Sequence, residues 1–220
     1  MFTEMHLHTE PVSPCANVSP QLIPKIYYEK NYRAIVVTNH YNRVVFESFF
    51  PKKSRAERVD YYLSGYYTLK EHAEKYNLKV FLGMEIALDC FASGAYYDCE
   101  FLLYGLTDGL LIKNPLLFSM PHAEFYKFCG GNNIAVYQAH PFRGGNKLAD
   151  ITLMDGIEGL NGNPRHNSNN DIAKAAAEKF NLKTVKGSDY HEFGDEGTGT
   201  GLPDFINTDE ELGKYLKSNK

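Results

Sequence analysis

Histidine residues stand at the ends of short apolar runs in this sequence, and this placement indicates metal chemistry. His6 and His8 close the first run, and His40 closes the run Ile35-Val36-Val37-Thr38-Asn39. Ring nitrogens that leave adjacent strand ends can converge on one metal ion, and a metal-dependent hydrolase needs an ion with an open coordination position. The position of these histidines at the ends of predicted strands, rather than their number, therefore indicates a metal site.

The same arrangement recurs along the rest of the chain. Further candidate ligands stand at or beside apolar runs: Glu85, Glu100, His140, Asp189 and His191. Residues i and i+2 of an extended strand point the same way, so the pairs His6/His8 and Asp189/His191 can each direct two ligands to one place. One such histidine taken alone is more often a loop or capping residue. Five of them together with two carboxylates favour a shared metal site.

The elements that would position these residues alternate between strand and helix patterns. Six apolar runs predict buried strands: Phe2 to Leu7, Ala34 to Thr38, Val80 to Ile86, Phe101 to Tyr104, Ile134 to Gln138 and Thr184 to Gly187. A seventh, weaker run spans Gly156 to Leu160. Helical patterns cover Gln21 to Lys30 and Ile172 to Phe180, and a capping-box pattern starts the last helix at Thr208. This alternation predicts parallel strands with crossover connections, and it favours an α/β barrel over an open doubly wound sheet.

Composition limits the class of protein. The 220 residues suit one domain, and a hydrophobic content of 43% can fill its core. A net charge of -4 gives no electrostatic footprint for a nucleic-acid polymer or an acidic membrane, and no run is long enough to span one. The four cysteines lack C-x-x-C spacing and the N-terminus lacks an apolar signal segment, so we expect reduced thiols and a cytoplasmic location.

The motifs resemble those of a known group when they are taken in order. His6-x-His8-Thr9, Thr38-Asn39-His40, Gly83-Met84-Glu85, Ala139-His140-Pro141 and Gly187-Ser188-Asp189-x-His191 are similar to the ordered motifs of the PHP (polymerase and histidinol phosphatase) superfamily. The resemblance implies a single distorted (β/α)7 barrel over residues 1–220, with two or three metal ions at the carboxyl ends of its strands. It also implies phosphoester hydrolysis by a metal-bridged hydroxide.

The resemblance implies a role for each candidate ligand. One ion would be held by His6, His8, Glu85 and Asp189, with Glu85 bridging to a second ion held by His140. A third ion would use His40 and His191, with Glu10 as a further candidate.

The sequence departs from the family pattern at two positions. Asn39 stands where aspartate is usual, so the hydrogen bonds around His40 would differ. Glu100 stands where a histidine ligand of the second ion is usual, and its oxygen would shift the site towards manganese or iron and away from zinc. The identity of the metal is therefore left open among zinc, manganese and iron.

Three arginines follow the metal motifs and are candidates for binding substrate phosphate: Arg43, Arg143 and Arg165. A guanidinium group matches phosphate oxygens bidentately, which lysine cannot do. Arg143 is favoured because it lies three residues after His140, although a surface ion pair would also explain each arginine. Asn161, in a Gly-Leu-Asn-Gly-Asn-Pro turn, is either a substrate contact or a turn residue.

Three functions are compatible with these features. The first is hydrolysis of a phosphoester in a small phosphorylated molecule, such as a sugar phosphate, a nucleotide or histidinol phosphate. The second is metal-dependent hydrolysis of a C–N or C–O bond, since similar ligands support amide chemistry in related barrels. The third is a barrel that binds metal without turnover. The arginines favour the first, and the sequence predicts neither the substrate nor the oligomeric state.

Overall fold

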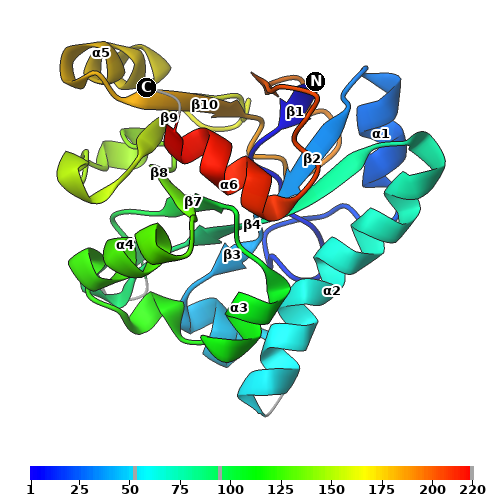
Figure 1. Ribbon diagram of the computed structural model, residues 1–220, viewed down its shortest axis with the longest axis horizontal. Coiled ribbons are helices and arrows are strands. Elements are labelled where there is room, and N and C mark those ends of the chain that lie inside the picture. Colours follow the sequence, from blue (N-terminus) through cyan, green and yellow to red (C-terminus); the bar gives the residue numbers. More distant parts are fainter. Residues whose placement is uncertain (52–53, 94–95, 219–220) are drawn as a thin grey trace.

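A nearly closed barrel of mixed strands forms the centre of the protein (Figure 1). The computed structural model describes residues 1–51, 54–93 and 96–218. Its main sheet has the order β10-β9-β8-β7-β4-β2-β1-β11, with β3 paired to β4. The strands are β1 (Phe2–Glu4), β2 (Ala34–Val37), β3 (His40–Tyr41), β4 (Lys79–Ile86), β7 (Phe101–Tyr104), β8 (Ala135–Gln138), β9 (Gly156–Asn161), β10 (Lys183–Gly187) and β11 (Thr200–Gly201). A separate antiparallel pair is formed by β5 (Ala92–Ser93) and β6 (Tyr96–Tyr97).

The barrel closes just beyond the ends of β1 and β10. The backbone amide of His8 donates to the carbonyl of Tyr190 at 2.9 Å, and the amide of Tyr190 donates to the carbonyl of His6 at 3.1 Å. Leu7 and Tyr190 thus form a parallel bridge between two segments that lie far apart in sequence. This closure brings the pair His6/His8 beside Asp189 and His191.

One strand runs against the predicted direction. β7 pairs antiparallel with both β4 and β8, whereas the other main pairs, β1–β2, β2–β4, β8–β9 and β9–β10, are parallel as expected. The expectation of parallel pairing throughout is therefore wrong at β7, because a run of four apolar residues carries no signal of direction. All seven predicted strands are present, although β1 ends at Glu4 and only the bridge at Leu7 continues the first predicted run.

Helices surround the sheet, and α6 crosses in front of it in Figure 1. They are α1 (Ile23–Glu29), α2 (Arg55–Ala73), α3 (Asp108–Lys113), α4 (His122–Gly131), α5 (Asn170–Phe180) and α6 (Asp209–Ser218). The predicted capping box of the last helix is confirmed, since the Thr208 hydroxyl accepts from the Glu211 amide and the Glu211 carboxylate accepts from the Thr208 amide. Among the described residues, no helix is both long and apolar enough to cross a membrane.

The side chains inside the barrel are apolar at one end of the barrel, and the candidate ligands lie at the other end. Along β4, Phe81 packs inside the barrel with Leu212 and Leu216 of α6. Every second residue shares this face, so Glu85 lies on the same side of β4 as Phe81. Glu100 likewise shares a face with Leu102 of β7. Because β7 is antiparallel, the residue before it lies at the same end of the barrel as the residues that follow its parallel neighbours.

Candidate metal centre

Four side chains that can ligate metal converge at the carboxyl end of the barrel. Nε2 of His6 lies 3.1 Å from Nε2 of His8. Nε2 of His6 is 3.3 Å from both Glu85 Oε1 and Asp189 Oδ1, and Nε2 of His8 is 3.4 Å from Glu85 Oε2 and Asp189 Oδ1. All four side chains are buried. These are the four residues that the resemblance assigns to the first ion.

This spacing fits a tetrahedral metal ion. Ligand atoms at about 2.0–2.1 Å from a tetrahedral zinc ion lie roughly 3.3 Å from one another. In addition, Oε2 of Glu85 is buried and accepts no hydrogen bond from the described residues, although Nδ1 of His40 lies only 2.8 Å away. Donor atoms that approach without satisfying one another are expected where an ion is to be held between them. The residues therefore fit a bound cation.

A second group of ligands adjoins the first through Glu85. His40 Nδ1 and His140 Nε2 lie 2.8 and 2.9 Å from the two Glu85 oxygens. Each of these ring nitrogens also lies 3.7 Å from one oxygen of Glu100. Glu100 thus points into the cluster, whereas Asp98, two residues earlier, is exposed and lines a different pocket. Among the described residues, Glu100 rather than Asp98 completes this group.

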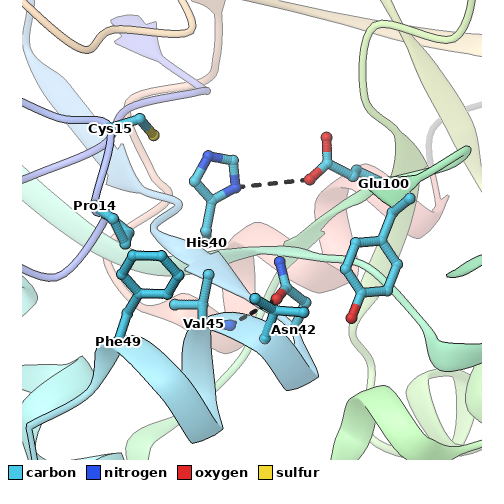
Figure 2. A pocket seen from close by; sticks show the side chains of 9 residues that line it. Pro14, Cys15, His40, Asn42, Val45, Phe49 and Glu100 are labelled. Carbon is cyan, nitrogen blue, oxygen red and sulfur yellow. Dashed lines mark hydrogen bonds and ion pairs between the residues drawn. The ribbon is translucent and has the colours of Figure 1, made fainter. Parts of the chain in front are cut away.

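A third group lies on the outer side of the first. His8, His40 and His191 offer donor atoms within 4.8 Å of one another. The Cys15 thiol hydrogen-bonds to the rings of His191 and His40, and its sulfur is turned towards His40 in Figure 2. Thiolate and imidazole together are common zinc ligands. Cys15 is therefore a further candidate ligand beside His40 and His191, and the role of Glu10 stays a prediction.

Hydrogen bonds lower the pKa of the Cys15 thiol. Desolvation alone would raise this pKa, but the hydrogen bonds to His191 and His40 bring it from 9.0 to about 6. The thiolate, which is the form that ligates metal, is therefore accessible at neutral pH.

Burial and charge set the protonation states of the other ligands. Burial and the neighbouring rings of His191 and His40 hold the pKa of His8 well below its usual range, so that ring is neutral and able to ligate. Burial opposes ionisation of Glu85, but His6 and His40 hold its pKa well below the usual range. Burial and the Glu85 charge instead raise the pKa of Glu100.

Four carboxyl groups lie in or beside the cluster. Glu85, Asp189 and Glu158 are each 1% exposed, and Glu100 is packed against the same site. The one arginine that bonds directly to these carboxyl groups among the described residues is Arg143. Burial alone would lower the pKa of His6, His40 and His140, but these carboxylates raise it, so protonated rings balance the charge in the absence of metal. A bound metal ion would take the place of those protons.

Glu158 positions two of the ligands. Its Oε1 lies 3.0 Å from Nδ1 of His6, on the opposite side of the ring from the nitrogen in the first group. Its Oε2 accepts from the backbone amide of His140 at 2.9 Å and from Nδ2 of Asn161 at 2.9 Å. A carboxylate behind a ligating imidazole fixes the tautomer and the ring orientation.

Asn39 supports His8 as well as His40. Nδ1 of His8 lies 3.1 Å from the Ser13 hydroxyl, which donates to Asn39 Oδ1 at 2.9 Å and accepts from the His40 amide at 3.0 Å. Asn39 Oδ1 also accepts from the Thr9 amide at 2.7 Å. The uncharged amide at position 39 therefore orients the two motifs through hydrogen bonds, without adding charge.

Two ligands have unusual backbone conformations. His140 has φ of 25° and Asp189 has φ of 51°, both on the left-handed side where side chains other than glycine are uncommon. Such conformations cost on the order of 1–3 kcal/mol and are concentrated at functional sites. Here they turn side chains at the ends of β8 and β10 into the cluster.

The three predicted arginines lie in different settings. Arg143 Nη2 donates to Asp189 Oδ2 at 2.5 Å and to Asn161 Oδ1 at 2.8 Å, and its side chain remains 20% exposed beside the cluster. Arg43 is bound by the carboxylates of Asp89 and Glu47 at the surface. Only Arg143 therefore contacts a candidate ligand through the hydrogen bonds and ion pairs found among the described residues.

Arg165 is bound in a similar way to Arg43, by Glu192 and Asp195. Asp195 in turn accepts from the His191 amide at 2.9 Å, which places Arg165 near the third group without touching it. A role of Arg43 or Arg165 in binding substrate stays a prediction.

Three residues of the site were missed from the sequence. They are Glu158, Ser13 and Cys15. Glu158 had a recognisable signal, since a carboxylate within the apolar run Gly156 to Leu160 is unusual for a buried strand. Ser13 and Cys15 had no such signal because they lie in a loop of irregular structure.

We compared the sequence and the fold of this chain with those of known proteins. Neither a protein-family model nor a curated protein matches the sequence. A two-domain protein from Bacteroides vulgatus that contains a predicted PHP-like metal-dependent phosphoesterase matches with a TM-score of 0.61 and 20% identity. The match covers 87% of this chain and 52% of that protein, so the chain spans about half its length.

Two further solved structures match over almost the whole of both chains. A proposed metal-dependent phosphoesterase from Bifidobacterium adolescentis has a TM-score of 0.54 and 16% identity, and the match covers 95% of this chain and 93% of the other. This chain has a PHP-like barrel fold. An amidohydrolase from Chromobacterium violaceum, solved with sulfate and no metal, has a TM-score of 0.59 and 12% identity, with 94% and 93% covered. The PHP-like barrel is thus similar to proteins assigned to two kinds of hydrolysis.

Proposed function

We propose that this protein is a metal-dependent phosphoesterase acting on a small phosphorylated molecule. The observation that carries the proposal is the convergence of His6, His8, Glu85 and Asp189, in which the two ring nitrogens lie 3.1 Å from each other and 3.3–3.4 Å from the carboxylate oxygens. Bound divalent ions would supply an activated water near neutral pH and would neutralise phosphoryl oxygens. A site of this kind needs no nucleophile from the protein.

The ligands would be divided among up to three ions. The first ion would be held by the four residues just named. Glu85, His140 and Glu100 would hold a second, and His40, His191 and Cys15 a third. Imidazole and thiolate favour zinc, whereas the oxygen of Glu100 favours manganese or iron at the second position.

Arg143 is our candidate for binding the substrate phosphate. Asp189 and Asn161 anchor its Nη2 atom, while the side chain stays partly exposed next to the cluster. A guanidinium fixed by two partners loses little further freedom when it binds an anion. Glu158 and Asn161 act as positioning residues, since they hold His6, His140 and Arg143 in place.

The second candidate is hydrolysis of a C–N bond. Its support is the similarity to the Chromobacterium violaceum amidohydrolase, which is as extensive as the similarity to the phosphoesterases. Arg143 beside the ligands favours the phosphoester, because a neutral amide needs no anion-binding group. A barrel that binds metal without turnover is the third alternative.

The test combines elemental analysis with an activity panel. Protein reconstituted separately with zinc, manganese and iron is assayed on phosphomonoesters, carboxyl esters and amides. We expect two or three ions per chain, phosphoester turnover and loss of activity with chelators. Metal content below about one ion per chain would refute a metal centre. Turnover of amides alone would favour the second candidate, and bound metal without any turnover the third.

A further inference from the structure

A pocket opens beside the second and third groups of ligands (Figure 2). His40, Glu100 and Cys15 form its inner wall, and its volume is about 350 Å³. In Figure 2 the His40 ring lies between Cys15 and Glu100, with Phe49 and Val45 below it. An organic group attached to a phosphate at the ligand cluster could therefore extend into this pocket.

The outer wall of the pocket is apolar. It is formed mainly by Pro14, Val44, Val45, Phe49 and Tyr97, and the polar side chain of Asn42 also lines the pocket. Phe49 is 56% exposed at the end of the short π-helix Val45–Phe49. Its exposed ring offers apolar surface that a group bound in the pocket could cover. The wall therefore favours an apolar partner.

Among the described residues, the outer part of the pocket offers no lysine or arginine to an anionic group. No lysine or arginine is among the described residues that line it, and its inner wall carries the carboxyl group of Glu100. Arg43 is next to the pocket residue Val44 in the chain, but the carboxylates of Asp89 and Glu47 already bind its guanidinium. Away from the ligand cluster, a second phosphate or a carboxylate would therefore find no lysine or arginine to pair with among the described residues of this pocket.

The pocket is large enough for an aromatic ring. A dry cavity of about 150 Å³ accommodates benzene, so the present pocket has room for one ring or two fused rings. Aromatic groups also pair favourably with an aromatic side chain such as Phe49 in offset or edge-to-face geometry.

We propose that this pocket binds the leaving group of the substrate and selects phosphomonoesters whose leaving group is uncharged and aromatic. The inference rests on the proposed phosphoesterase function and names its substrate class. The phosphate lies at the metal ligands and Arg143, while the ring lies against Phe49 beside His40 and Glu100.

The test compares benzyl phosphate, ethyl phosphate and phosphoglycolate. Benzyl and ethyl alcohols are similarly basic leaving groups, so the two esters differ mainly by the ring, and phosphoglycolate adds a carboxylate. We expect kcat/KM of the metal-reconstituted protein to be about tenfold to a hundredfold higher for benzyl than for ethyl phosphate, as burial of a phenyl group predicts. Phosphoglycolate should be the poorest substrate. Equal rates for the benzyl and ethyl esters would overturn the proposal.

A variant pair links the selectivity to the pocket. Phe49→Ala should narrow the benzyl-to-ethyl ratio by about fivefold to tenfold. The matched control is Phe205→Ala, because Phe205 is also an exposed phenylalanine, at 66%, but is not a pocket residue. A ratio unchanged by Phe49→Ala, or changed equally by both variants, would contradict the proposal.

A binding measurement keeps this inference separate from the proposed function. Benzylphosphonate and ethylphosphonate cannot be hydrolysed, and calorimetry gives their affinities for the metal-loaded protein without turnover. Tighter binding of benzylphosphonate that is lost in Phe49→Ala supports the pocket even if no ester is hydrolysed. Equal affinities would refute the pocket even if esters are hydrolysed.

Discussion

Glu158 Oε1 lies 3.0 Å from Nδ1 of His6 and thereby determines which nitrogen of that ring faces the metal ligands. The Nδ1–H group donates to the carboxylate, so Nε2 is the nitrogen available 3.1 Å from Nε2 of His8. Glu158 also accepts from the His140 amide, at a residue whose φ is positive. One buried carboxylate thus orients a ligand of the first group and one of the second.

Replacement of this carboxylate tests its positioning role. Glu158→Gln keeps the shape of the side chain but removes its charge, so we expect metal affinity to fall about tenfold to a hundredfold. The measurement is a chelator competition for zinc, with thermal unfolding as a check on folding. The control is Glu29→Gln, which makes the same change at a surface ion pair with Lys25. Zinc affinity equal to that of the control would remove Glu158 from the metal centre.

Cys15 offers a test that does not depend on turnover. With the pKa of its thiol lowered to about 6, the thiolate form dominates above that pH and is lost below it. In metal-free protein, alkylation of Cys15 should therefore rise with pH, be half-maximal near pH 6 and level off above it. Peptide mass spectrometry after iodoacetamide treatment follows Cys15 apart from the other cysteines.

Metal should protect the same thiol. If Cys15 ligates an ion with His40 and His191, zinc should slow its alkylation, and His191→Ala should both reduce this protection and move the pH midpoint upward. Exposed Cys90 is the internal control for reagent activity. Equal alkylation of Cys15 with and without zinc would show that it is not a ligand.

The convergence of the candidate ligands was predictable from the sequence, but the residues that hold them in place were not. His6, His8, Glu85 and Asp189 follow apolar runs, and the ends of parallel strands meet at one face of a barrel, so their convergence could be expected. His6 and Glu158 are separated by 152 residues, and the pairing of two particular side chains across a barrel depends on register and closure. The sequence pattern indicates faces, but it does not indicate such pairs.

The direction of β7 shows a second limit. Four apolar residues predict a strand, yet they do not say whether it runs parallel or antiparallel. Glu100 precedes β7 and would lie at the far end of the barrel if β7 were parallel. It lies 3.7 Å from ring nitrogens of His40 and His140 because the strand is reversed. The position of Glu100 among the ligands was indicated by the resemblance to an ordered set of motifs. The periodicity of the apolar residues did not indicate it.

Arg143 is expected to bind phosphate rather than metal. Arg143→Lys keeps the charge but loses the planar fork, so kcat/KM should fall about tenfold to a thousandfold, as loss of a charged bidentate contact suggests. Because Arg143 also donates to Asp189, metal content must be measured in the same preparation. Arg43→Lys is the matched control, at an exposed arginine bound by Asp89 and Glu47. Unchanged kinetics with every substrate would show that Arg143 only supports Asp189 and Asn161 and does not bind phosphate.

Glu100 should set the metal preference of the second group. Its carboxylate adds negative charge and a hard oxygen ligand next to Glu85 and His140, which favours manganese or iron. Glu100→His supplies an imidazole instead and should move the preference towards zinc, measured as the ratio of zinc to manganese bound under competition. Glu100→Ala should cost one ion per chain and leave the ion of His6 and His8, because that ion has four ligands of its own. Asp98→Ala is the control, since this exposed carboxylate lines a different pocket. If Glu100→Ala retains as many ions as Asp98→Ala, then Glu100 is not a ligand and the second ion depends on Glu85 and the histidines alone.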